Sequence, residues 1–370
     1  MSPFKGVFEN IQESIQENIQ NESFSNSHEQ VIYCNDPSVG LKAIIAMHST
    51  VLGPATGGCR MWAYASEQEA LTDVLRLSKG MTYKAAISGL NWGGGKAVII
   101  ASPGDSKTAK NPAMLERFGE YIDRLGGNYI TAKDVGIGSE DLRVVKRKTK
   151  HVLGIDGEPG TSGDPSPATA WGVYNGMKSA AQIALGNASL KGLTIALQGL
   201  GTVSYHLLDY LVKEGATVVG CDIDAQAIER AVKKYGIEII RPEAIYDVKC
   251  DIFSPSALGA SINAETLPRL QTRVIAGAAN NQLATSEIGV EVMKRGILYA
   301  PDYAINAGGL INIYHEGVEQ GGYNPVRAFA HVEKIGDTIT QILERARGFG
   351  LPPHVVADQM AEERVNAKRV

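Results

Sequence analysis

The stretch LTIALQGLGTVS, residues 193–204, decides the fold of this chain. Residues 193–198 are an apolar run typical of a buried strand, and a Gly-x-Gly turn follows it at once. A helical pattern then leads to Gly215, and a second strand-like run, 217–221, ends in Asp222. Strand, glycine turn, helix, strand and acidic residue in this order predict a parallel α/β unit of the Rossmann type.

The ligand that this unit predicts is a dinucleotide. Backbone amides at a glycine turn and a helix N-terminus bind a pyrophosphate, and the third position of the glycine pattern holds a small serine. The acid at the end of the second strand would accept from ribose hydroxyls and repel a 2′-phosphate, which favours NAD over NADP. The predicted cofactor-binding residues are Gly199, Leu200, Gly201, Thr202, Val203, Ser204 and Asp222.

Further strand-like runs at 252–253, 274–276 and 297–300 extend the predicted parallel sheet. The last two run into small and amide residues, as expected where a parallel sheet faces a nicotinamide ring. We predict that Ala278, Asn280 and Asn306 lie on the cofactor side and Asn281 on the substrate side.

Two lysine segments, GMTYK at 80–84 and GGGK at 93–96, stand out in the first half of the chain. Each lysine is followed by an uncharged apolar run, and the glycines suggest close approach of backbone and ligand. A helix over 66–80, closing on Gly80, would lead directly into them. We predict a cationic pocket in which one lysine holds an anion and the other does chemistry; two surface lysines beside a flexible loop are the alternative.

Two further segments supply candidate site residues. The strand-like run 129–132 leads into Asp134 and Gly136, a usual position for a catalytic carboxylate, although an aspartate before a glycine also forms turns. The segment GPATGG at 53–58 would place exposed backbone amides of Gly57 and Gly58 beside Arg60, which suits a carboxylate or a structural turn.

Composition limits the class of protein. The chain has 370 residues, 44% hydrophobic and 21% charged, with a net charge of −4 and no long charged or apolar block. We therefore expect no nucleic-acid or membrane partner and a cytoplasmic location. The four cysteines lack metal-type spacing, which predicts neither zinc nor a disulfide.

A change to Gly, Pro and Ser at 156–167 predicts a loop between two domains. We expect a substrate-binding and catalytic domain over 1–155, a Rossmann domain over 165–335, and helices at 338–370 that return to the first domain. Strands at 31–34 and 41–46 would form a hairpin, and apolar residues at helical spacing predict an amphipathic helix within 1–27.

These motifs, in this order, resemble the amino-acid dehydrogenase superfamily of glutamate, leucine, phenylalanine and valine dehydrogenases. The likeness is greatest to the leucine, phenylalanine and tryptophan enzymes and extends from about Glu29 to Arg364. It implies an α/β protein of two domains with a cleft between them: an N-terminal substrate and oligomerisation domain and a Rossmann NAD-binding domain. It also implies a homo-oligomer.

The activity that the resemblance implies is NAD-dependent, reversible oxidative deamination of an L-amino acid to a 2-oxo acid and ammonia. Lys84 matches the family lysine that binds the α-carboxylate, Lys96 the catalytic lysine and Asp134 the catalytic aspartate. In this reading hydride leaves the α-carbon, Lys96 activates the water that attacks the imine, and Asp134 exchanges a proton with nitrogen.

The substrate side chain is implied to be apolar. Thr56 stands where glutamate dehydrogenases carry a lysine, and Ala132, Leu310 and Ile313 match positions that line the side-chain pocket. Branched-chain and aromatic amino acids both stay open, because one methylene changes selectivity by only about 1 to 3 kcal/mol. A catalytically silent dinucleotide-binding regulator is the alternative; it would have lost a lysine or the aspartate, and none is lost.

Overall fold

The computed structural model describes residues 28–101, 110–317 and 321–369, so the helix expected within 1–27 lies outside the described residues. The chain divides into two compact units. Unit 1 comprises Met1–Thr82 and Trp92–Val152, and unit 2 comprises Tyr83–Asn91 and Leu153–Val370.

The division differs in two places from the one that we expected. Residues 338–370 belong to unit 2, and so does the segment 83–91, which we had assigned to the first domain. Contacts within unit 2 give the physical reason. Arg364 near the C-terminus donates hydrogen bonds to the carbonyl oxygens of Ala85 and Ala86, and the Tyr83 hydroxyl donates to Glu362.

Unit 1 is built on a mixed five-stranded sheet. Its strands are β1 (Gln30–Asp36), β2 (Leu41–Ser49), β3 (Ala55–Trp62), β4 (Gly93–Ile100) and β5 (Tyr129–Lys133), in the order β1-β2-β4-β3-β5. The expected hairpin is confirmed, since β1 and β2 pair antiparallel. We had expected exposed backbone at 53–58, and this is wrong for residues 55–58. Ala55 begins β3, which pairs parallel with β4 and β5.

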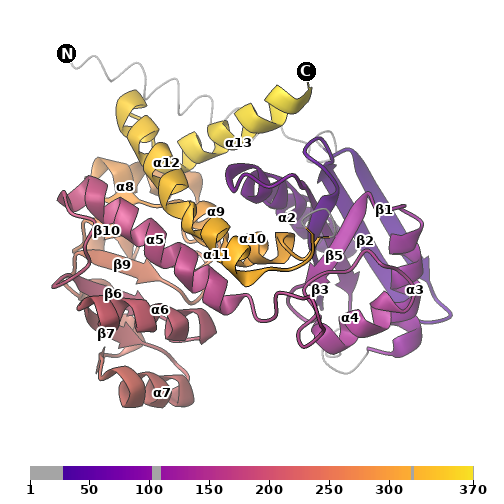
Figure 1. The fold of residues 1–370 in the computed structure, drawn as a ribbon, viewed down its shortest axis with the longest axis horizontal. Helices are drawn as coiled ribbons and strands as arrows, with labels where there is room; N and C mark the ends of the chain where they lie inside the picture. The colour runs from indigo at the N-terminus through magenta and orange to yellow at the C-terminus, as the bar shows by residue number, and fades with distance from the viewer. Residues whose placement is uncertain (1–27, 102–109, 318–320, 370) are drawn as a thin grey trace. The chain divides into compact units, whose positions relative to one another are not determined.

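Helices pack on both faces of this sheet (Figure 1). On one face Ala70 and Val74 of α2 (Glu67–Ile87) join a buried cluster with Ile44, Ala46 and Val98 of the sheet. Helices α3 (Pro112–Asp123) and α4 (Ser139–Lys146) cover the other face.

Helix α2 does not close on Gly80, as we had expected, but continues to Ile87. Gly80 is exposed, and a Cβ built there meets no atom within 4 Å. A glycine inside a helix costs only about 1 kcal/mol. Burial of Thr82, Ala85 and Ala86 beyond it offsets this cost, so Lys84 lies on the helix and not in a loop after it.

Unit 2 contains the predicted Rossmann sheet. Its six strands are β6 (Thr194–Gln198), β7 (Thr217–Cys221), β8 (Glu238–Ile239), β9 (Ile252–Pro255), β10 (Val274–Ile275) and β11 (Leu298–Tyr299). They pair in parallel in the order β11-β10-β9-β6-β7-β8. This order reverses at β6, the switch point at which doubly wound sheets bind their ligands.

Helices surround this sheet and extend beyond it (Figure 1). They are α5 (Ser166–Leu185), α6 (Thr202–Glu214), α7 (Ala225–Tyr235), α8 (Ser286–Lys294), α9 (Asp302–Ile305), α10 (Gly308–Tyr314), α11 (Pro325–Glu333), α12 (Ile335–Phe349) and α13 (Pro353–Arg369). Gly172 and Gly176 of α5 let Ile335 and Ile305 pack closely against its backbone. In the described part of the chain, no helix has the length and apolar character to cross a membrane.

Candidate functional site

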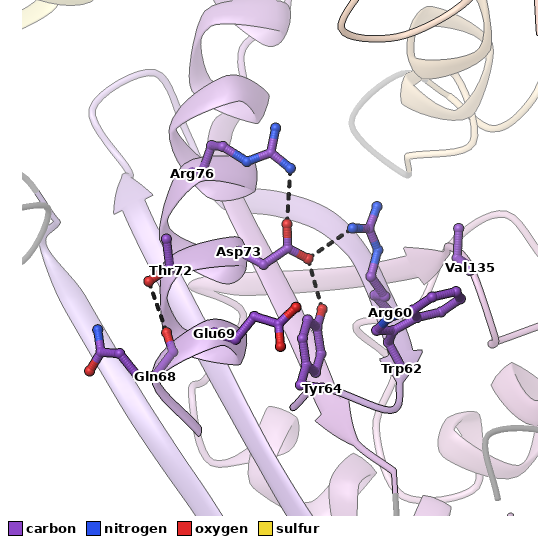
Figure 2. Close-up of a pocket in the computed structure, with 9 residues that line it drawn as sticks. All are labelled: Arg60, Trp62, Tyr64, Gln68, Glu69, Thr72, Asp73, Arg76 and Val135. Carbon is purple, nitrogen blue, oxygen red and sulfur yellow. Dashed lines mark hydrogen bonds and ion pairs between the residues drawn. The ribbon is translucent and has the colours of Figure 1, made fainter. Parts of the chain in front are cut away.

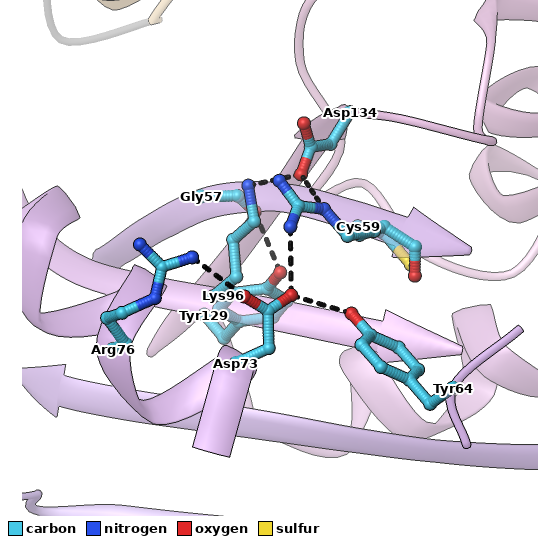
Figure 3. A network of polar contacts seen from close by, with 9 residues as sticks. Gly57, Cys59, Tyr64, Asp73, Arg76, Lys96, Tyr129 and Asp134 are labelled. Atoms are coloured by element: carbon cyan, nitrogen blue, oxygen red, sulfur yellow. Dashed lines mark hydrogen bonds and ion pairs between the residues drawn. The ribbon is translucent and has the colours of Figure 1, made fainter. Parts of the chain in front are cut away.

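Lys96 and Asp134 form an ion pair in unit 1 (Figure 3). Lys96 lies within β4, Asp134 follows the end of β5, and the distance from Lys96 Nζ to Asp134 Oδ2 is 2.5 Å. Lys96 is only 7% exposed. The structure therefore joins the two predicted catalytic residues at one place and excludes the surface alternative for this lysine.

The environment of Asp134 keeps it ionised. Burial by itself raises the pKa of this carboxyl, but the charge and hydrogen bond of Lys96 and the charge of Arg60 outweigh that effect. The pKa of Asp134 consequently lies below its ordinary value. At neutral pH the residue is a carboxylate that can accept a proton.

The glycines before Lys96 serve close packing within unit 1. A Cβ at Gly94 would lie 2.1 Å from the backbone nitrogen of Thr82, and one at Gly95 would lie 2.8 Å from the ring of Tyr129. We had expected these glycines to admit a ligand. Their Cβ positions are instead filled by α2 and β5, so they bring β4 and its lysine close to these elements.

Gly57 and Gly58 are buried residues of β3, so the expectation that their amides lie in an exposed turn is wrong. A Cβ at Gly57 would overlap the carbonyl oxygen of Gly95 at 1.7 Å, and one at Gly58 would approach Asp134 Cβ at 2.9 Å. The Tyr129 hydroxyl donates to the carbonyl oxygen of Gly57 at 2.7 Å. Both glycines are thus needed for the approach of neighbouring strands beside the ion pair.

Two further predicted residues lie in the same sheet. Thr56 is 2% exposed, and its hydroxyl donates to the Pro54 carbonyl oxygen at 3.1 Å. Ala132, at 8% exposure, lies near the end of β5. Neither position contributes a charge, and their assignment to a substrate side-chain pocket stays a prediction.

Lys84 belongs to a second group, in unit 2. Its Nζ donates to Asn306 Oδ1 at 2.6 Å, and the Asn306 amide donates to Asn280 Oδ1 at 2.8 Å and to the Ala278 carbonyl oxygen at 3.1 Å. The adjacent Asn281 has a left-handed backbone with φ 51°. The structure thus places the lysine predicted for the substrate beside three residues predicted for the cofactor.

Asp302, at the start of α9, was missed by sequence reasoning. Burial raises the pKa of Asp302, although backbone hydrogen bonds and the charge of Lys84 oppose that effect. Its carboxylate accepts from the backbone nitrogen of Gln282 at 3.3 Å. An aspartate after a proline predicts only a helix start, and the fold alone shows that this one lies near the partly buried Lys84.

Leu310 and Ile313 lie three residues apart on α10, so they share one side of this helix. Both are partly exposed, and Ile313 also lies near Gly154, where a Cβ would be 3.4 Å from its side chain.

The glycine turn of unit 2 suits a dinucleotide. Gly199 has φ +96°, and a Cβ there would lie 2.9 Å from Ala257. Gly201 is the N-cap of α6, and a Cβ there would meet nothing within 4 Å, so the start of the helix is open. Asp222 Oδ2 accepts from the Leu200 backbone nitrogen at 2.6 Å. The turn is therefore braced by the acid that the sequence predicts at the ribose.

The other residues of this segment either pack in the interior or lie at the open start of α6. The side chains of Leu200 and Ser204 are buried, at 1% exposure each, whereas Thr202 and Val203 in the first turn of α6 are more exposed. Leu200 can therefore offer a ligand its backbone and not its side chain.

A pocket of about 680 Å³ lies in unit 1 next to the ion pair (Figure 2). Arg60, Tyr64 and Asp73 form part of its wall. Arg60 also contacts Asp134, with 3.2 Å between Nε and Oδ2. We had noted this arginine only as a neighbour of the glycine segment, because its contact with residue 134 depends on the pairing of β3 with β5.

Both halves of the chain match models of known families. Residues 28–151 match the model described as Glu/Leu/Phe/Val dehydrogenase, dimerisation domain, and residues 222–367 match that described as Glutamate/Leucine/Phenylalanine/Valine dehydrogenase.

Named relatives are similar over almost their whole length. Leucine dehydrogenase of Thermoactinomyces intermedius is 51% identical, with 92% of each chain covered. Phenylalanine dehydrogenase of Bacillus thermotolerans is 43% identical over 93% of this chain and 90% of the relative. The crystal structure of L-tryptophan dehydrogenase from Nostoc punctiforme superposes with a TM-score of 0.82 at 40% identity, covering 93% of this chain and 97% of that one.

Proposed function

We propose, from the premise that this chain belongs to the glutamate/leucine/phenylalanine/valine dehydrogenase family, that it deaminates a branched-chain L-amino acid with NAD. The family makes the protein an amino-acid dehydrogenase, which catalyses reversible oxidative deamination to a 2-oxo acid and ammonia. The choice of a branched-chain substrate is supported by identity, which is 51% with a leucine enzyme and 43% with a phenylalanine enzyme. Aromatic amino acids are the second candidates.

The observation that carries this proposal is the buried ion pair of Lys96 and Asp134. A lysine ammonium can polarise the oxygen of an attacking water or of a developing 2-oxo group. A carboxylate that is ionised at neutral pH is available to take the proton from a substrate ammonium and to return it later. We assign water activation to Lys96 and proton exchange at nitrogen to Asp134.

The substrate carboxylate is assigned to Lys84. Its ammonium is held by Asn306 and lies near Asp302, so it is oriented before an anion binds. The side-chain pocket is assigned to Thr56, Ala132, Leu310 and Ile313, with Gly57, Gly58 and Asn281 at the substrate backbone. None of the four pocket positions carries a charge.

NAD is the cofactor that we assign, because the open start of α6 and the braced turn at Gly199 and Gly201 fit a pyrophosphate. Asp222 would face the adenosine ribose, and Ala278, Asn280 and Asn306 the nicotinamide side. When bound, the dinucleotide supplies the acceptor for the hydride from the substrate α-carbon.

A silent regulator on this fold is not favoured, because its catalytic lysine or aspartate would be lost. Here both are present and paired. We also propose a homo-oligomer, since the family model matched by residues 28–151 is described as a dimerisation domain, and a cytoplasmic location.

The substrate proposal is tested by steady-state kinetics with leucine, valine, isoleucine, phenylalanine, tryptophan and glutamate, followed by NADH absorbance. We expect the highest kcat/KM with a branched-chain substrate and no measurable rate with glutamate, because the pocket positions carry no cation for its second carboxylate. A preference for an aromatic substrate would overturn the branched-chain assignment. If no NADH forms with any of the six amino acids, the proposed activity is wrong, although the fold assignment is unaffected.

Asp222→Ala tests the cofactor assignment. We expect the KM for NAD to rise about tenfold and the preference for NAD over NADP to fall, because a ribose acceptor and a charge that repels a 2′-phosphate are both removed. Asp224→Ala is the control, since Asp224 caps α7 by accepting from Gln226 at 2.9 Å. Equal cofactor preference in the two variants would mean that Asp222 only braces the turn.

A further inference from the structure

Arg60 links the Lys96 and Asp134 pair to a second acid. Its Nε donates to Asp134 Oδ2 at 3.2 Å, and its Nη1 donates to Asp73 Oδ2 at 2.8 Å. The guanidinium is planar, so these two contacts fix both its position and its orientation. Arg60 lies on β3 and Asp73 on α2, so the bridge joins the sheet to the helix that covers it.

Asp73 is itself held by two further donors (Figures 2 and 3). The Tyr64 hydroxyl donates to Asp73 Oδ2 at 2.7 Å, and Arg76 Nη2 donates to Oδ1 at 2.9 Å. The Asp73 side chain is 15% exposed, which limits screening by solvent. The Tyr64 hydroxyl contacts the same oxygen that accepts from Arg60 and so fixes Asp73 as an anchor, whereas the half-exposed Arg76 adds little to it.

The two cations beside Asp134 contact the same oxygen. Lys96 Nζ lies 2.5 Å from Oδ2, and Arg60 Nε lies 3.2 Å from it. An oxygen that already accepts from two cations is a poor proton acceptor, because a proton there would be repelled by both. Proton exchange with substrate therefore falls to Oδ1.

We propose that Arg60, anchored by Asp73, is a positioning residue that turns Oδ1 of Asp134 toward the reacting nitrogen. This inference rests on the proposed role of Asp134. Arg60 acts through the aspartate and does not touch substrate. Its contribution is to hold one rotamer of the carboxylate through the reaction, in addition to the contact of Lys96 with Oδ2 and the hydrogen bond from the Val135 backbone nitrogen.

Variants of the two arginines that contact Asp73 distinguish this role from a general effect of removing a positive charge. Arg60→Ala removes the cation that joins Asp73 to Asp134, whereas Arg76→Ala removes a cation that contacts Asp73 alone. With leucine and NAD we expect Arg60→Ala to lower kcat roughly 10- to 100-fold with little change in the KM for NAD. Arg76→Ala should change kcat less than about threefold.

Chemical rescue gives a readout that a merely structural role would not move. Arg60 lines the open pocket of Figure 2, so a small cation can reach the space left by its side chain. Methylguanidine at millimolar concentration should restore part of the kcat of Arg60→Ala, while methylammonium, which lacks the planar fork, should not. Arg60→Lys should stay impaired for the same reason.

These outcomes distinguish a failure of the positioning role from a failure of the proposed function. Equal kcat in Arg60→Ala and Arg76→Ala, or no rescue by methylguanidine, would overturn the positioning role. Asp134→Asn, measured in parallel, tests the site itself. If Asp134→Asn is inactive while Arg60→Ala behaves as Arg76→Ala does, only the inference fails; if Asp134→Asn keeps its rate, the role of Asp134 and the inference fail together.

Discussion

Lys96→Ala is expected to lower kcat at least about 1,000-fold while the Kd for NAD changes less than about threefold. The loss follows because Lys96 is the buried cation of the pair with Asp134, and alanine can neither polarise a water nor stabilise an oxyanion. NAD binding is spared because the glycine turn and Asp222 belong to unit 2. NADH formation with leucine measures kcat, and fluorescence titration measures binding.

Lys110→Ala is the matched control for Lys96→Ala. Lys110 also forms a partly buried ion pair in unit 1, with 2.6 Å between its Nζ and Asp141 Oδ2. Loss of this pair should cost stability but leave kcat within about twofold. A Lys96→Ala enzyme with substantial turnover would remove Lys96 from the mechanism, and a similar loss in both variants would point to unfolding.

Gly57→Ala is expected to destabilise unit 1 by about 3 kcal/mol, the second large effect. The added Cβ would lie 1.7 Å from the carbonyl oxygen of Gly95, and a backbone atom on a central strand cannot move aside as a flexible side chain can. Thermal unfolding followed by circular dichroism should show a midpoint lower by roughly 6 °C or more.

Gly80→Ala gives the opposite expectation. A Cβ at Gly80 meets no atom within 4 Å, and alanine favours the helical backbone by about 1 kcal/mol. We expect a small rise in the unfolding midpoint with unchanged kinetics.

A Gly57→Ala protein as stable as the parent would show that β3 and β4 can separate at this point, which contradicts the packing argument.

The fold of unit 2 was legible in the sequence because its signals are local. The run 193–204 contains a strand, a turn that needs Gly199 at positive φ and the start of a helix, all within a few residues. Parallel pairing of the next strands then follows from chain topology, and the structure confirms the sheet order. Lys96 and Asp134 were candidates for the same reason, since each lies next to a recognisable strand.

Our interpretation of the glycines was wrong because the requirement for glycine at these positions comes from contacts that are distant in the sequence. Gly57 and Gly94 carry negative φ, so no turn requires them. They are needed because Gly95 and Thr82, from other elements, fill their Cβ positions. A sequence shows that a glycine is present, but the atom that would meet its Cβ is known only when the strands are paired.

The sequence by itself determined the fold class, the parallel α/β unit and the candidate residues Lys84, Lys96 and Asp134, because strand, turn and helix signals act over a few neighbours. Only the tertiary structure decided which charges meet. Pairing of β3 with β5 brings Arg60 to Asp134, and packing of α2 on the sheet brings Asp73 to Arg60. Arg60 is 13 positions from Asp73 and 74 positions from Asp134, so both contacts depend on strand order and helix docking, which no local pattern encodes.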